Sequence, residues 1–173
     1  MLIKLREVTP ADGENIAKWR NSINVIKHCI DKTVISKESN QIFYEKMIVT
    51  GKYRQYIVER VDEEFGGLFA YQIGTIYFKD IDETNHKCEL GMFPGEDEEW
   101  NSESQKLAVE QMLQKAWHDL SLHKVYAYVY TDCHEEVKLL EDCGFIKEGE
   151  LVDEICDNSN YRNLLRLCAI NAE

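Results

Sequence analysis

The sequence predicts an α/β fold of the α+β kind, with a mixed central sheet of about seven strands flanked by helices. Two observations support this prediction. Segments in which apolar and polar residues alternate, as they do in half-buried strands, occur near both ends and through the middle of the chain. In the second half, strand-like and helix-like patterns follow each other in turn. Because the 173 residues contain no linker-like segment, we expect one domain over residues 1–173.

The first part of the chain predicts one strand followed by three helical segments. Residues 2–8 alternate apolar and polar side chains and predict a strand. Residues 9–12 supply an N-cap, a proline and an acid, so a helix should run from there to about Arg20. A short helical piece is expected over residues 25–29, and a longer helix over residues 36–49. The side chains predicted to be buried in the longer helix are Ile42, Phe43, Met47 and Ile48.

The middle of the chain predicts an antiparallel meander of three strands. Two β-rich runs cover residues 55–61 and 68–79, and we place the acidic residues 62–64, with the glycines that follow them, in the turn. A polar turn over residues 80–85 then leads to a third strand over residues 86–93.

The last part of the chain predicts two helices and three strands. The clearest helix has apolar residues at helical spacing, namely Val109, Met112, Leu113, Ala116, Trp117 and Leu120. A strand with alternating tyrosines covers residues 125–130, and a second helix runs from about His134 to a stop at Gly144. A hairpin of residues 145–155 and 161–169, joined by a polar turn, completes the chain.

The charge of the chain excludes some partners and favours others. With 32 acidic and 20 basic residues the formal net charge is −12, which repels nucleic acid and attracts a cationic amine. The same charge is also typical of bacterial-type proteins whose acidic surface only keeps them in solution. No apolar run approaches bilayer length and no signal-peptide core is present, so we expect no membrane partner and a cytoplasmic location.

Cysteine and histidine spacing gives no indication of a metal site. The six cysteines are scattered without a CxxC motif or a Cys/His ligand spacing, which predicts reduced thiols rather than disulfides or zinc ligands. Four histidines likewise show no ligand spacing, and we expect them at the surface or in turns; they are His86, His118, His123 and His134.

Five segments carry motifs that belong together. They are residues 17–21 (AKWRN), 36–48, 89–93 (ELGMF), 122–126 (LHKVY) and 141–149 (EDCGFIKEG). In this order they resemble the GNAT (Gcn5-related N-acetyltransferase) superfamily, and within it the RimJ/RimL-like branch. The resemblance implies the GNAT fold, acetyl-CoA as cofactor, and acetyl transfer to a primary amine of a small metabolite, an amino sugar or a protein N-terminus. It also implies that the chain could form a homodimer.

The loop before the central helix departs from that family. Where GNAT proteins usually read W-G-K-G-Y-G-T, residues 100–106 read WNSESQK, so the three glycines that shape a pyrophosphate-binding loop are absent and Glu103 brings a negative charge. Ser102 and Gln105 match the spacing of a capping box, which would satisfy the helix N-terminus from within. The helix dipole still favours an anion, so weakened CoA binding is expected. An enzyme and a binding or regulatory domain that has lost CoA binding therefore both remain open.

The resemblance also suggests roles for individual residues. Glu89 is the candidate general base, and its alternative role is a plain ion pair with Lys87 or a residue of a neighbouring strand. Trp19 and Arg20 would border the acceptor site, although core packing of the first helix is the favoured explanation for Trp19. The predicted cofactor contacts are Met92, Phe93, Asn101, Ser102, Ser104, Gln105, Lys106 and Cys133. Leu140 occupies the position of the tyrosine that often protonates the leaving thiolate, and leucine has no proton to donate.

Overall fold

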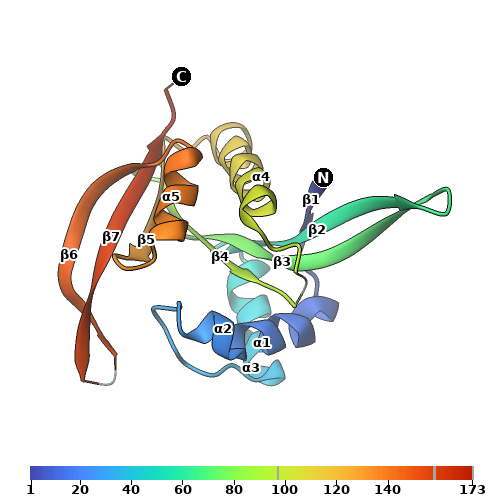
Figure 1. Ribbon diagram of the computed structural model, residues 1–173, viewed down its shortest axis with the longest axis horizontal. Coiled ribbons are helices and arrows are strands. Elements are labelled where there is room, and N and C mark those ends of the chain that lie inside the picture. Colours follow the sequence, from blue (N-terminus) through green and yellow to red (C-terminus); the bar gives the residue numbers. More distant parts are fainter. Residues whose placement is uncertain (97, 158, 173) are drawn as a thin grey trace.

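The chain forms a seven-stranded mixed sheet with helices on both faces (Figure 1). The computed structural model describes residues 1–96, 98–157 and 159–172, so Asp97, Asn158 and Glu173 lie outside the described residues. The strands are β1 (Leu2–Glu7), β2 (Arg54–Glu64), β3 (Gly67–Asp82), β4 (Lys87–Pro94), β5 (Lys124–Tyr130), β6 (Ile146–Asp157) and β7 (Asn160–Ile170). Their order in the sheet is β1-β2-β3-β4-β5-β7-β6, with β4 and β5 parallel and every other pair antiparallel. The predicted fold class is confirmed.

Two groups of helices cover the two faces of the sheet. The helices are η1 (Pro10–Asp12), α1 (Gly13–Asn21), α2 (Ile23–Ile26), α3 (Lys37–Phe43), η2 (Tyr44–Ile48), α4 (Ser102–Gln114), η3 (Lys115–Asp119) and α5 (His134–Asp142). α4 and α5 lie on one face, and α1 to α3 on the other (Figure 1). Among the described residues, no helix has the length and hydropathy that crossing a bilayer requires.

Each face has its own hydrophobic core. The larger core lies under α4 and α5, where Val109 and Met112 of α4 are fully buried against Cys88 and Leu90 of β4. The buried stripe predicted for α4 is therefore confirmed in its central turns. The smaller core lies under α1 and α2 and contains Trp19. Side chains of β4 alternate between the two cores because successive strand residues point to opposite faces.

The turn between β2 and β3 was predicted in the wrong place. The acidic residues 62–64 continue β2, and the turn is formed by Phe65 and Gly66, with φ values of 50° and 77°. Two successive positive φ values suit the right-handed twist of a tight hairpin. This ribbon extends beyond the helices (Figure 1), so it has no covered face and its strand residues need not be apolar. Acidic residues therefore do not mark a turn here.

The helix predicted over residues 36–49 exists, but its buried stripe was only partly right. Ser36 is the N-cap and accepts a hydrogen bond from the Ser39 backbone N–H, as predicted. Ile42 is exposed, whereas Phe43, Met47 and Ile48 are half-buried. The helix passes into a π turn at Tyr44, and the changed number of residues per turn shifts which side chains face the sheet.

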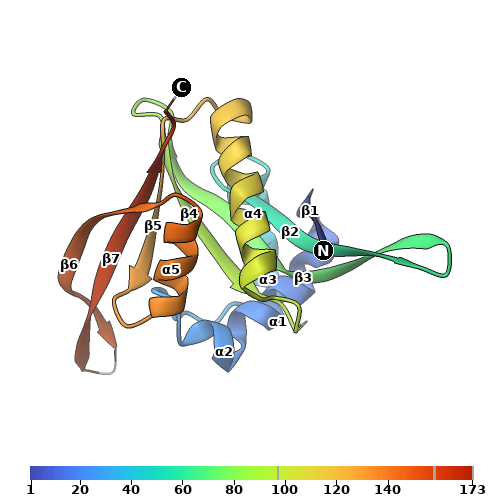
Figure 2. The ribbon, with the colours of Figure 1, turned by 45° about the horizontal axis from the view of Figure 1, so that its top comes forward.

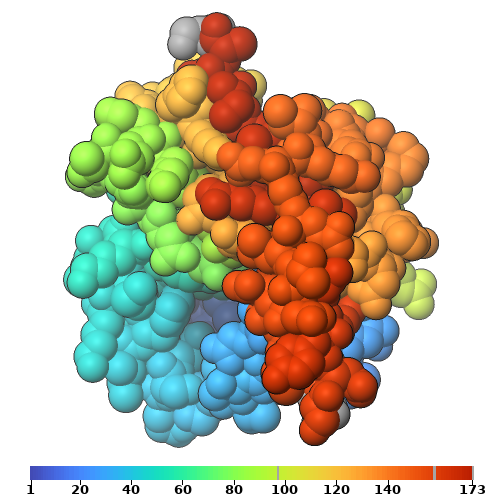
Figure 3. Space-filling model, turned by 90° about the vertical axis from the view of Figure 1, so that its left-hand side faces the viewer, coloured from blue at the N-terminus to red at the C-terminus, as the bar shows by residue number. Residues whose placement is uncertain are grey.

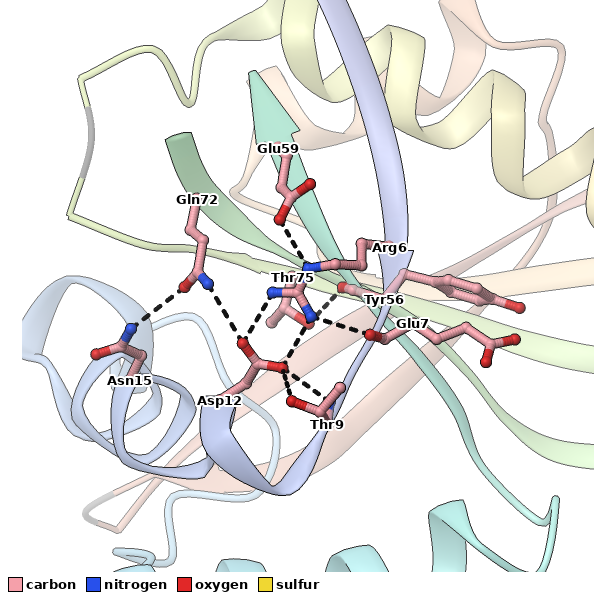
Figure 4. A network of polar contacts seen from close by, with 9 residues as sticks. All are labelled: Arg6, Glu7, Thr9, Asp12, Asn15, Tyr56, Glu59, Gln72 and Thr75. Carbon is pink, nitrogen blue, oxygen red and sulfur yellow. Dashed lines mark hydrogen bonds and ion pairs between the residues drawn. The ribbon is translucent and has the colours of Figure 1, made fainter. Parts of the chain in front are cut away.

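A polar network ties the first strand to η1 and to the strands beside it (Figure 4). Arg6 donates to Glu59 at 2.7 Å and to both carboxylate oxygens of Asp12, at 2.8 and 3.0 Å. Asp12 also accepts from the backbone N–H and hydroxyl of Thr9 and from Gln72. Burial by itself would raise the pKa of Asp12, but the hydrogen bonds from Arg6 and Thr9 outweigh it and hold that pKa below its usual value.

We predict that Asp12→Ala lowers the free energy of unfolding by about 2–3 kcal/mol, because it leaves Arg6 with one carboxylate and removes several charge-assisted hydrogen bonds. A carboxyl with a depressed folded-state pKa stabilises the fold above its unfolded pKa, and this stabilisation is lost as the pH falls through the folded pKa. The variant should therefore lose less stability than wild type on acidification, measured by urea denaturation between neutral and acidic pH. Glu14→Ala, which removes an exposed ion pair with Lys37, is the control and should change stability by about 0.5 kcal/mol or less. Equal effects of the two variants would contradict the prediction.

Candidate functional site

The two parallel strands of the sheet separate part-way along their length. β4 pairs with β5 only from Lys87 to Glu89, opposite Lys124 to Tyr126. Beyond Glu89, β4 continues to pair with β3 as far as Pro94, while β5 continues to pair with β7. Figure 2 shows the two strands diverging below this point. The β5-facing edge of β4 therefore offers backbone groups that no strand occupies in the described part of the chain.

Glu89 occupies the last paired position before the strands diverge. Its neighbours Cys88 and Leu90 point into the core under α4, so its side chain points to the opposite face, where α1 to α3 lie. The residue is only 7% exposed, and its carboxylate lies 3.0 Å from the ammonium of Lys79 on β3. Burial raises the pKa of Glu89, and Lys79 offsets part of that rise. The predicted ion pair thus exists with a neighbouring strand and not with Lys87.

Tyrosines and arginines line the sheet beside Glu89. Tyr126 lies opposite Glu89 in the strand register, and burial, followed by the charge of Glu89, raises its pKa to about 12. The guanidinium of Arg166 lies 4.2 Å from the ring centre of Tyr126, and that of Arg162 lies 3.5 Å from the ring centre of Tyr130. The tyrosines of β5 therefore share one face of the sheet, as their alternation predicted, and stacked arginines cover them.

An aromatic groove opens beside the Lys79–Glu89 pair. Tyr53 stacks on Tyr77 with ring centres 4.8 Å apart and meets the edge of Phe43 at the same distance. Tyr77 lies so close to Gly91 that a β-carbon there would come within 2.4 Å of the ring, so only glycine fits. The groove encloses about 320 Å³ and is lined by Phe43, Met47, Lys52, Tyr53, Lys79, Asp80 and Ile81. Figure 3 shows a hollow between the cyan segment that contains α3 and the orange segment that contains β6, although none of the groove-lining residues belongs to β6.

The two predicted acceptor-site residues have different surroundings. Trp19 is 4% exposed and packs with Ile57 and Phe93, so its position is that of a core residue. Arg20 donates through Nη2 to the backbone carbonyl of Asp31, and its buried Nη1 has no hydrogen-bond partner in the described part of the chain. Phe93, predicted as a cofactor contact, directs its side chain into the same core, and its backbone groups face β3, where it lies opposite Thr75.

The N-terminus of α4 is capped, but by a different pair of residues from those predicted. Asn101 is the N-cap, and its side-chain oxygen accepts from the backbone N–H groups of Glu103 and Ser104, both at 3.1 Å. The Ser104 hydroxyl completes the box by accepting from the Asn101 backbone N–H. The predicted box of Ser102 and Gln105 was thus one residue too late, because asparagine was not considered as the N-cap.

The other predicted contacts of this loop differ in exposure and in their partners. Ser104, in the first turn of α4, is fully buried, and the Gln105 side chain donates to the Trp100 backbone carbonyl at 3.4 Å. Lys106 pairs with Glu110 one turn further along the helix. Ser102, the first residue of α4, is exposed.

On the β5 side of the divergence, Cys133 is the N-cap of α5. Its thiol lies 3.5 Å from Nδ1 of His28, which comes from the segment after α2. Burial, together with the charges of Glu136 and Asp132, raises the pKa of the Cys133 thiol to about 11, so the thiol carries its proton at neutral pH. Leu140 is 3% exposed and belongs to the larger core.

A family model agrees with this geometry. Residues 3–146 match the model described as the acetyltransferase (GNAT) domain. The chain belongs to the GNAT acetyltransferase family. The relatives of this GNAT chain do not support the finer resemblance to the RimJ/RimL-like branch.

Those relatives are polyamine acetyltransferases. The spermidine N(1)-acetyltransferase of Vibrio cholerae serotype O1 is 23% identical over 171 residues, which cover 99% of this chain and 94% of the relative. That of Escherichia coli K12 is 22% identical over 166 residues, which cover 96% of this chain and 84% of the relative. The structure of the Vibrio cholerae spermidine N-acetyltransferase in complex with CoA and spermine has a TM-score of 0.87 at 23% identity, covering 97% of this chain and 95% of the other.

GNAT acetyltransferases use acetyl-CoA, and most of the site described above fits it. The free edge of β4 offers backbone groups to the arm of the cofactor, including those of Met92. At the α4 N-terminus, the amides that would bind a pyrophosphate are occupied by the Asn101 side chain, which a bound anion has to displace. Together with the relatives, the family match favours acetyl transfer over a domain that has lost CoA binding.

We predict that Lys79→Met raises the pKa of Glu89 further, because the variant removes the cation that offsets the effect of burial. The side-chain ¹³C resonance of Glu89, followed by NMR as a function of pH, measures this shift directly. Lys87→Met is the matched control. Lys87 pairs with Asp82, so this variant should leave the pKa of Glu89 unchanged. A Glu89 pKa that does not change in Lys79→Met would show that the ion pair is absent in solution.

Proposed function

We propose that this protein transfers the acetyl group of acetyl-CoA to a primary amine of a polyamine, with Glu89 as the general base. The observation that carries the proposal is the buried carboxylate of Glu89 at the point where β4 and β5 diverge. In this position it lies between the free edge of β4 and the aromatic groove that contains Tyr53. A base placed there reaches both a thioester in the divergence and an amine in the groove.

Charge and aromatic lining support a polyamine as the acceptor. The net charge of −12 attracts a polycation, and Phe43 and Tyr53 offer ring faces that stabilise an ammonium or its methylene chain. Asp80 adds a carboxylate to the groove lining, while the charge of Lys79 is already paired with Glu89. The relatives named as spermidine N-acetyltransferases support the same class over the protein N-terminus that a RimJ/RimL-like enzyme would use.

The chemistry needs an unprotonated amine and a polarised carbonyl. Acetyl-CoA supplies the activated acetyl group when it is bound. Glu89 takes a proton from the acceptor ammonium, a role that its raised pKa suits because the driving force for proton transfer increases. The backbone N–H of Met92, at the free strand edge, is placed to donate to the developing oxyanion. Leu140 supplies no acid, so the proton for the leaving thiolate comes from another group or from water.

The proposal is tested by incubating the purified protein with acetyl-CoA and spermidine or spermine and measuring release of the CoA thiol. Glu89→Gln should lower kcat by about 10²–10⁴-fold, the usual contribution of a general base, while calorimetry shows unchanged CoA binding. Glu83→Gln, at the exposed β3–β4 turn, is the charge-matched control and should keep full activity. Absence of transfer to every amine, with no heat from CoA, would overturn the proposal.

We further predict that Asn101→Gly binds CoA more tightly than wild type. The substitution releases the two amides that the asparagine side chain occupies and restores a glycine to the loop. An N-cap interaction contributes about 1 kcal/mol, so Kd should fall about fivefold, measured by calorimetry. Ser36→Gly removes the N-cap of α3 instead and should leave the Kd for CoA unchanged. Weaker binding by Asn101→Gly would mean that Asn101 holds the anion itself.

A further inference from the structure

A cysteine, a histidine and a glutamate that are distant in sequence lie together beside the N-terminus of α5. His28 follows α2, Cys133 is the N-cap of α5, and Glu136 lies in the first turn of that helix. The Nδ1 atom of His28 lies 3.5 Å from the Cys133 sulfur and 3.2 Å from a Glu136 carboxylate oxygen. All three ligand atoms lie within 4.8 Å of one another, and this is the one such group found among the described residues.

We propose that His28, Cys133 and Glu136 form a binding site for a divalent transition-metal ion of the zinc class. A tetrahedral zinc ion has bonds of about 2.3 Å to sulfur and about 2.0–2.1 Å to nitrogen and oxygen, so its sulfur and nitrogen ligands lie about 3.5 Å apart and its nitrogen and oxygen ligands about 3.4 Å apart. The corresponding separations here are 3.5 and 3.2 Å. Two of the three ligand separations therefore match edges of a zinc tetrahedron, and the third, between the Cys133 sulfur and the Glu136 oxygen, is no more than 4.8 Å.

The chemistry of the ligand set selects the kind of ion. Thiolate and imidazole are ligands for zinc and related metals, whereas magnesium and calcium take sites made of oxygen atoms. Three protein ligands leave a fourth position for water or another small ligand, and the half-exposed side chains of His28 and Glu136 keep that position open to solvent.

Both sides of the site are held in place by contacts that do not involve an ion. The turn before Cys133 is fixed by Arg162, which donates to Asp132 at 2.7 Å and stacks on Tyr130. The Tyr130 hydroxyl donates to the backbone carbonyl of Cys29, and this bond ties the segment after His28 to the end of β5. Pre-ordered ligands lose little conformational entropy on binding, so these contacts favour a specific site.

An ion bound at this site would connect two parts of the fold. α2 packs through Val25 in the core that contains Phe93 of β4, while Cys133 and Glu136 follow the end of β5. An ion bound to all three residues therefore joins the β4 side of the divergence to the β5 side. This cross-link would stabilise the folded protein whether or not acetyl transfer occurs, so it can be tested without an activity assay.

The test uses full-length protein without a histidine tag, stripped of metal by a chelator. Titration with Zn²⁺ against a chromophoric competitor should give one ion per chain, and Co²⁺ should show a thiolate charge-transfer band with the intense visible bands of tetrahedral coordination. His28→Ala, Cys133→Ala and Glu136→Gln should each weaken Zn²⁺ binding at least about tenfold and abolish the Zn²⁺-dependent rise in Tm.

Matched variants separate this site from incidental binding by surface groups. Cys156→Ala removes an exposed thiol on β6 and His118→Ala an exposed imidazole on η3, and neither should change Zn²⁺ affinity. Binding that is unaffected by Cys133→Ala, or equally reduced by Cys156→Ala, would overturn the proposal. So would a Co²⁺ complex without a thiolate band, because the cysteine ligand would then be missing.

Discussion

The separation of β4 from β5 after Glu89 is the constraint on which the rest of this structure depends. Two sets of contacts keep the strands apart. β4 stays paired with β3 as far as Pro94 and packs Phe93 into the core under α1, while β5 stays paired with β7 as far as Tyr130. Each strand is thus held by its other neighbour. The backbone groups left free between them do not depend on the loop before α4, so they remain available although that loop lacks the glycines usual in the family.

At the N-terminus of α4, stability and ligand binding require the same atoms. The Asn101 side chain satisfies two amides that would otherwise bind an anion, and Ser104 completes the cap. This arrangement stabilises the helix in the absence of ligand. It makes the free energy of pyrophosphate binding less favourable by the free energy that the cap contributes to the helix. CoA affinity in this protein is therefore linked to the stability of its central helix. A glycine-rich loop avoids that link because it has no side chain to compete with the ligand.

The charge pair of Lys79 and Glu89 links the sheet to the chemistry. Burial raises the pKa of the carboxyl, and a lysine on the neighbouring strand limits the rise; the raised pKa makes the side chain a stronger base than an exposed glutamate. The aromatic groove lies beside the pair, and the two rings in its lining come from α3 and from the turn after η2.

How much the sequence predicted depends on how local each feature is. The stripe of α4 that includes Val109 and Met112 was predicted correctly, since helical spacing and burial are properties of one segment. The turn placed at residues 62–64 and the burial of Ile42 were wrong, because a projecting ribbon and a π turn depend on what covers the segment. The cap was misplaced by one residue, since Asn101 and Ser102 both suit an N-cap.

By itself, the sequence determined the order of the elements, the family and the candidate base Glu89, because each of these is written in a contiguous motif. Only the tertiary structure decided that Lys79 is the partner of Glu89, and that His28 lies beside Cys133 although 105 positions separate them. Cross-strand register makes the first contact, and the approach of the segment after α2 to the end of β5 makes the second. Neither contact can be predicted from residue spacing in the sequence, because the approach of two distant segments depends on the packing of the whole core and not on either segment alone.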